Sequence, residues 1–154
     1  MSYDFFKFIH IFGVIVFMGN IIVTALWKAR ADGTGNPVIV AFAQKLVILT
    51  DWVFTLGGVA LVLIGGYGMA SATGFESWET DWLVWGQGLF SASALIWIAI
   101  LIPLQVMQNR AAQKFATGNQ IPAAYWRRNR WWFSWGIVAT IIPLATLYLM
   151  VVKP

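Results

Sequence analysis

The chain has 154 residues, of which 60% are hydrophobic and only 10% charged, and its formal net charge is +4. A water-soluble fold of this length could not bury so much apolar surface, so the composition excludes an ordinary soluble domain and indicates an integral membrane protein. The chain has no cysteine, which excludes disulfides, thiolate metal sites and cysteine nucleophiles.

Four apolar runs are long enough to cross a bilayer, which takes about 20 helical residues. They predict an all-α fold, a four-transmembrane-helix bundle that runs up-down-up-down as a single integral membrane domain over residues 1–154. The predicted helices cover about residues 5–27, 46–69, 82–107 and 131–152. The first run lacks the basic leader and the cleavage site of a secretory signal, so we expect it to be retained.

Basic residues gather in the first and third connections between these runs. The two connections hold Lys28, Arg30, Lys45, Arg110, Lys114, Arg127, Arg128 and Arg130, whereas the second connection carries the acidic residues Glu76, Glu79 and Asp81. Because cytoplasmic loops carry the excess of Lys and Arg, both termini are expected on the outer side. The expected location is the bacterial cytoplasmic (inner) membrane.

The third connection ends in a basic and aromatic cluster, formed by Arg127, Arg128, Arg130, Trp131 and Trp132. Arginines attract anionic headgroups and tryptophans are enriched at membrane surfaces, so we expect the cluster to contact lipid headgroups. Its position beside an apolar run argues against nucleic acid as a partner. The expected partners are the lipid bilayer and other membrane protein subunits or further copies of the chain.

Polar residues inside apolar helices cost free energy unless they face the bundle interior. Three-or-four spacing defines one face on the first run (Tyr3, Phe6, His10, Gly13, Phe17, Asn20, Thr24 and Trp27) and one on the second (Gln44, Asp51, Thr55, Gly58, Val62, Gly65 and Met69). We expect both faces to point to the bundle centre. The third run places Gln87, Ser91, Ala94, Ile98, Leu101 and Gln105 on one side, and Pro103 and Pro143 are kink candidates.

Asp51 is the costliest of these residues to place in a bilayer. It lies at the same depth as Asn20, Thr24 and Gln105, so we expect an intramembrane polar cluster of these four near the inner boundary. Asp51 could act there as a proton relay or a cation site. It could equally join the helices by hydrogen-bonding the first helix, or contact a lysine of the first connection.

His10 is the only histidine, and Lys7 precedes it by three residues on the same helix face. It is expected near the outer end of the first helix, level with Gln87 and Met69. A neutral imidazole is a common haem or copper ligand, but it could also be a structural side chain bonded to a neighbouring helix. With one histidine, a haem iron would be five-coordinate, paired with Met69, or bridged by His10 of a second copy.

The run Lys7-Phe8-Ile9-His10 resembles the start of HemJ-type protoporphyrinogen oxidases and of copper-resistance protein D-like membrane proteins. That resemblance implies haem b held by His10, although the chain has no second intramembrane lysine to match the other key residue of the HemJ type. A longer resemblance, to a bacterial family of predicted four-helix integral membrane proteins of unknown function, is carried by residues 7–10, 25–32, 50–55, 105–107, 122–127 and 150–154. It implies a fold and no activity.

Three functions follow as hypotheses. The first is a small non-enzymatic integral membrane protein that acts as an accessory or helper subunit of a larger membrane complex, because no complete catalytic constellation is present. The second is a haem-binding redox membrane protein related to HemJ, based on Lys7 and His10. The third is a small proton-coupled transporter component, based on Asp51 opposite Asn20.

Overall fold

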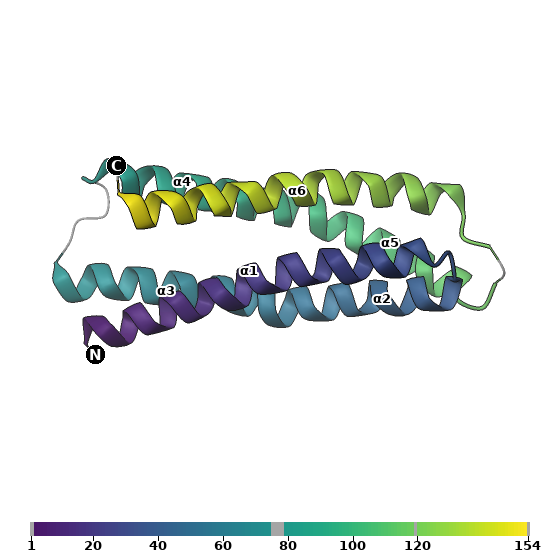
Figure 1. The fold of residues 1–154 in the computed structure, drawn as a ribbon, viewed down its shortest axis with the longest axis horizontal. Helices are drawn as coiled ribbons and strands as arrows, with labels where there is room; N and C mark the ends of the chain where they lie inside the picture. The colour runs from purple at the N-terminus through teal and green to yellow at the C-terminus, as the bar shows by residue number, and fades with distance from the viewer. Residues whose placement is uncertain (1, 75–78, 119, 154) are drawn as a thin grey trace.

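The computed structural model describes residues 2–74, 79–118 and 120–153. Its helical elements, in chain order, are α1 (Tyr3–Gly33), α2 (Pro37–Thr50), the π-helical turn η1 (Asp51–Thr55), α3 (Leu56–Thr73), α4 (Asp81–Ile96), the π-helical turn η2 (Trp97–Leu101), α5 (Ile102–Phe115) and α6 (Ala123–Val152). They combine into four spans, each long and apolar enough to cross a membrane, and successive spans run in opposite directions (Figure 1). The predicted all-α four-helix fold is confirmed.

The spans are longer than the apolar runs of the sequence. At about 1.5 Å per residue, the 31 residues of α1 extend about 46 Å, whereas the hydrocarbon core of a bilayer is about 30 Å thick. The extra length lies largely at the end that carries the connections at residues 34–36 and 116–122, which we call the basic end (Figure 1). Much of the first and third connections is therefore helix and not loop. Each helix thus continues beyond its apolar run into more polar sequence.

The turn between α1 and α2 is built by local chemistry at Gly35, Asn36 and Pro37. Gly35 has a φ of 62°, a left-handed conformation that favours glycine. The Asn36 side chain accepts hydrogen bonds from the backbone of Val38 and Ile39, and Pro37 occupies the first turn of α2, where its missing N–H costs nothing. In the acidic connection, Glu76 and the other residues of 75–78 lie outside the described part of the chain.

Helix α1 packs closely along α3 through glycines. A Cβ atom added to Gly13 would lie 2.8 Å from the backbone nitrogen of Val62, and one added to Gly65 would lie 2.5 Å from the backbone nitrogen of His10. Small residues allow such close backbone approach, which drives helix association where lipid removes the hydrophobic driving force. Gly58 is buried in the same interface, so the faces expected on the first two runs do meet.

The interior face of the third span matches the expected one only in part. Ser91 and Ile98 are exposed, whereas Ser93 is buried and its hydroxyl donates to a carbonyl of α6 at 2.9 Å. Leu101 and Gln105, which lie at and beyond the end of η2, are buried as expected. Ala94 and Ile98 of the expected face still border the bundle interior. A π turn inserts an extra residue, so constant helical spacing counted back through η2 misses Ser93. Figure 1 shows the span changing direction between α4 and α5.

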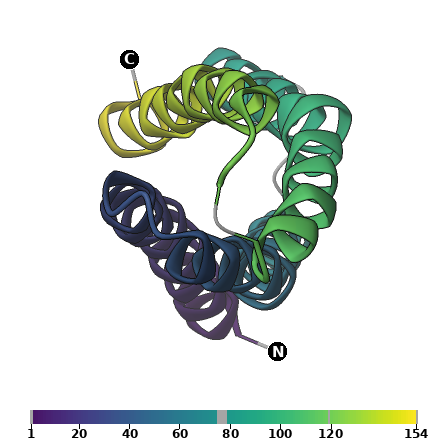
Figure 2. The same ribbon diagram turned by 90° about the vertical axis from the view of Figure 1, so that its right-hand side faces the viewer.

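The spans form two pairs, α1 with α2–α3 and α4–α5 with α6. Seen along the bundle, the four spans lie around a common axis in chain order (Figure 2). Helices α2 and α5 join the two pairs at the basic end, and α1 also touches α6. Towards the other end, the Tyr67 hydroxyl of α3 donates to the Gln87 side chain of α4 at 3.3 Å.

Both chain ends lie at the end opposite the basic one (Figure 1). With the basic end in the cytoplasm, a reporter fused after Lys153 is expected to report the outer compartment, and one inserted at Gly118 the cytoplasm. Paired alkaline phosphatase and fluorescent-protein fusions in cells measure this directly. The same compartment at both positions would contradict the topology, and exchanged compartments would reverse its orientation.

Candidate intramembrane binding site

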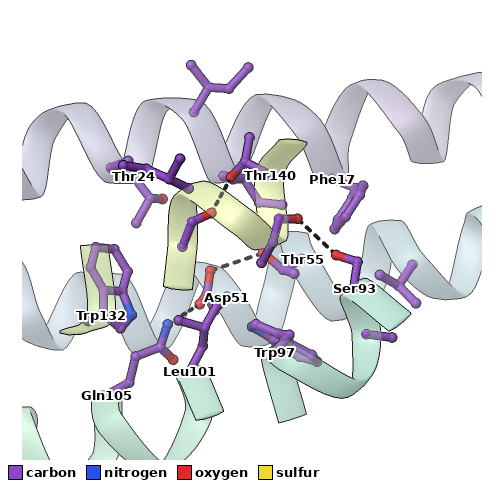
Figure 3. Close-up of a pocket in the computed structure, with 18 of the residues that line it drawn as sticks. Phe17, Thr24, Asp51, Thr55, Ser93, Trp97, Leu101, Gln105, Trp132 and Thr140 are labelled. Carbon is purple, nitrogen blue, oxygen red and sulfur yellow. Dashed lines mark hydrogen bonds between the residues drawn. The ribbon is translucent and has the colours of Figure 1, made fainter. Parts of the chain in front are cut away.

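A cavity of about 400 Å³ lies between the two helix pairs, bordered by α1, η1, α3, α4, η2, α5 and α6. Its lining is mainly apolar, with Thr24, Asp51, Thr55, Ser93, Gln105 and Thr140 as polar members (Figure 3). Four lining residues, Ile22, Ile98, Ile137 and Ile141, are more than half exposed. The cavity therefore reaches the face that lipid chains cover.

Asp51 forms the polar end of the cavity and is 8% exposed. Its Oδ1 atom accepts from Asn20 Nδ2 at 3.1 Å and from Thr55 Oγ1 at 3.0 Å, and its Oδ2 atom accepts from Gln105 Nε2 at 2.5 Å. The carboxyl group thus joins α1, η1 and α5. Buried polar groups are tolerated when their hydrogen bonds are made, and here each oxygen has a donor.

Asn20 and Thr24 extend this cluster along α1. The Asn20 amide also donates to the Thr50 carbonyl at 3.3 Å and to Thr55 Oγ1 at 2.9 Å. Its own carbonyl oxygen accepts from the Thr24 hydroxyl at 3.2 Å. The structure therefore brings together all four residues expected in the intramembrane cluster, and it adds Thr55.

Both π turns border the cavity. In η1 the Leu56 N–H bonds to the Asp51 carbonyl, and in η2 the Ile102 N–H bonds to the Trp97 carbonyl, five residues back in each case. Single π turns inside α-helices are frequent at functional sites, because they widen the helix and change which side chains face inward. Here they direct Asp51, Thr55 and Trp97 to the same space (Figure 3).

A second polar cluster, at the basic end, was not expected from the sequence. Lys28 is fully buried, and its Nζ atom lies 2.9 Å from Asp32 Oδ2 and 3.1 Å from the Tyr125 hydroxyl. Asn129 Nδ2 donates to the same Asp32 oxygen at 2.8 Å, and Gln108 Nε2 donates to Asn129 Oδ1 at 3.3 Å. We call these five residues the Lys28 cluster; it joins α1, α5 and α6.

Aromatic rings complete the surroundings of the Lys28 ammonium group. Its Nζ atom lies 5.4 Å from the centre of the Tyr125 ring and 5.6 Å from that of Trp132. Such distances give a favourable cation–π interaction. A sequence signal did exist, since Lys28 and Asp32, and likewise Tyr125 and Asn129, are four residues apart and so share a helix face.

His10 lies in the α1–α3 interface, away from the cavity. Its Nδ1 atom is 2.8 Å from the Val62 carbonyl oxygen, and because a carbonyl can only accept, Nδ1 carries the hydrogen. Lys7 is exposed and Met69 is partly buried. His10 is not among the residues that line the cavity. The Nδ1 atom of His10 is thus bonded within the helix pair, and the haem hypothesis stays a prediction.

The basic and aromatic cluster at the start of the fourth span divides between two environments. Arg127, Arg130 and Trp131 are exposed and Arg128 is partly buried. Trp132 was expected at the headgroups, but it is only 6% exposed and lines the cavity. Neighbouring residues on an α-helix point about 100° apart, and here that rotation takes Trp132 from the exposed side of α6 to its buried side.

Comparison with known proteins identifies a family. The model of a family described as predicted integral membrane protein (DUF2269) matches residues 4–154. None of the curated proteins and none of the solved structures matches the chain. The match extends over both polar clusters and the cavity, and it agrees with the longer of the two resemblances seen in the sequence. The chain therefore belongs to this DUF2269 family of predicted integral membrane proteins.

Proposed function

We propose that the chain is a small non-enzymatic membrane protein that binds a lipid-soluble small molecule between its helix pairs. The observation that carries the proposal is the cavity, which is apolar along most of its wall and polar at Asp51. Ligand-binding pockets in proteins typically have volumes of about 300–1,000 Å³, apolar walls and a few polar groups that orient the ligand. The expected ligand is an amphipathic molecule that enters from the bilayer.

The helper role fits within this proposal. A bundle that holds a lipid-soluble molecule can store it, carry it or present it to a partner subunit without performing chemistry on it. The route from the bilayer passes Ile22, Ile98 and Ile137, whose exposed side chains would contact a partner helix as readily as lipid. The expected setting is the bacterial cytoplasmic membrane, with both termini outside.

Proton-coupled transport is a less favoured alternative. Asp51 accepts hydrogen bonds from three side chains. Asn20 and Gln105 belong to the first and third spans, and Thr55 belongs to the same span as Asp51. A carboxyl group held in this way is arranged as a fixed structural acceptor, since releasing it for a transport cycle would break all three bonds. We therefore propose that the polar end of the cavity contacts a bound ligand and does not carry protons.

Photolabelling tests the proposed cavity. In proteoliposomes that contain a lipid-soluble diazirine probe, we expect crosslinks on cavity residues of α4 and α6. Ala94→Phe fills the cavity from α4 and should reduce this labelling severalfold. Leu95→Phe is the matched control, because the adjacent Leu95 side chain is 66% exposed and does not line the cavity.

Thr140→Phe, from the opposite wall, provides an independent filling variant. Both filling variants should keep the melting temperature within a few degrees of the unmodified protein, so that reduced labelling reports occupancy and not unfolding. Equal labelling in the filled, control and unmodified proteins would show that the probe marks only the outer surface, and the proposal would then be wrong.

A further inference from the structure

Trp132 places an unused hydrogen-bond donor in the cavity wall. Its side chain is 6% exposed, and its buried Nε1 atom has no partner among the described residues. Figure 3 shows this nitrogen on the side of the ring that faces Gln105 and Asp51. Buried tryptophan N–H groups usually find a partner, so an unpaired one beside a cavity marks the place of a missing acceptor.

Within the described part of the chain, Trp132 Nε1 makes no hydrogen bond to the polar groups beside it, and neither does the buried Nε1 atom of Trp97 on the same wall. Gln105 gives its Nε2 hydrogen bond to Asp51 Oδ2, and Asp51 Oδ1 accepts from Asn20 and Thr55. The acceptor for Trp132 is therefore expected from a molecule in the cavity. The carboxyl group of Asp51 beside this position disfavours an anionic ligand, which leaves a neutral acceptor such as a carbonyl oxygen.

The cavity wall also favours a flat ligand. Phe17, Phe90 and Trp97 line it together with Trp132. The Phe17 and Phe90 rings meet edge to face, with centroids 6.0 Å apart. Aromatic walls pack well against a planar conjugated ring, through stacked or edge contacts.

We propose that the cavity binds a neutral, planar, lipid-soluble carbonyl compound of the quinone class, with one carbonyl oxygen accepting from Trp132 Nε1. The inference rests on the proposed function and adds the chemistry of the ligand. It concerns binding alone and includes no electron transfer. The ester carbonyl of a neutral lipid could accept the same hydrogen bond. The test therefore compares a quinone with a neutral lipid.

The experiment measures how well soluble competitors displace the diazirine probe from cavity residues. A decyl-substituted benzoquinone should displace it from the unmodified protein. Trp132→Phe keeps a ring and removes the N–H, so it should raise the quinone concentration for half-displacement about tenfold, the effect of losing one hydrogen bond to a buried group. Trp131→Phe is the matched control, because its neighbouring ring is 57% exposed.

Decylbenzene, which has the tail and ring but no carbonyl, should displace the probe equally from the unmodified protein and the Trp132→Phe variant. Unchanged probe labelling in that variant also establishes that its cavity is intact. Equal quinone displacement in the two proteins would overturn the inference and leave the acceptor for Trp132 to an ordered water. A Trp132-dependent displacement by diacylglycerol and not by quinone would overturn it in favour of a lipid ester. Absence of cavity labelling in the unmodified protein would instead refute the proposed function itself.

Discussion

Replacing Lys28 by methionine is expected to lower the free energy of unfolding by about 3–5 kcal/mol, the usual cost of removing one partner of a buried ion pair. The substitution keeps a long, unbranched side chain and removes its charge. Asp32 would stay buried without its cation, 9% exposed, and the Tyr125 hydroxyl would lose a donor. Reversible unfolding in mixed micelles of dodecyl maltoside and SDS measures the change.

Arg30→Met is the matched control for Lys28→Met. Arg30 lies two residues further along α1, but its side chain is exposed, so its removal should change stability by no more than about 0.5 kcal/mol. The double variant Lys28→Met with Asp32→Leu should recover part of the loss, because it leaves no uncompensated charge. Equal effects of Lys28→Met and Arg30→Met would contradict the buried arrangement of the Lys28 cluster.

The four spans and the meeting of the first two could be predicted from the sequence because both depend on local regularities. Apolar length sets the number of spans. Three-or-four spacing placed Gly13, Gly58 and Gly65 on facing sides, and the two continuous helices α1 and α3 preserve that spacing. The same reasoning placed Asp51 opposite Asn20, and their side chains are 3.1 Å apart.

Two features could not be predicted from the sequence. One depends on a departure from regular helix, and the other on a contact between residues far apart in the chain. The π turn η2 carries no distinct sequence pattern, so the inward position of Ser93 could not be counted from Gln105. Lys28 and Tyr125 are 97 residues apart. Lysines near the ends of apolar runs usually set topology, and nothing local distinguishes a lysine that pairs with a distant tyrosine.

Asp51 at the polar end of the cavity gives the second large expected effect. Asp51→Leu should lower the free energy of unfolding by about 2–4 kcal/mol, because the amides of Asn20 and Gln105 would both lose a buried acceptor, and each unpaired group costs roughly 1–3 kcal/mol. The loss should fall on the contacts between α1, η1 and α5. Unfolding in mixed micelles measures the change in the free energy of unfolding. Hydrogen exchange of α1 and α5 shows which helix contacts have weakened.

Asp51→Asn is the control that separates charge from hydrogen bonding. The side-chain oxygen that this substitution keeps can still accept from Asn20 and Thr55, and Gln105 can turn its amide to present an oxygen to the new NH₂ group, so folding should be nearly unchanged. In the Asp51→Leu variant, the further substitution Gln105→Leu should lower the free energy of unfolding much less than it does in the unmodified protein. The reason is that the two side chains act as a pair. If Asp51→Asn destabilised the protein as strongly as Asp51→Leu, the negative charge itself would be required, and Asp51 would have to be reconsidered as a proton or cation site.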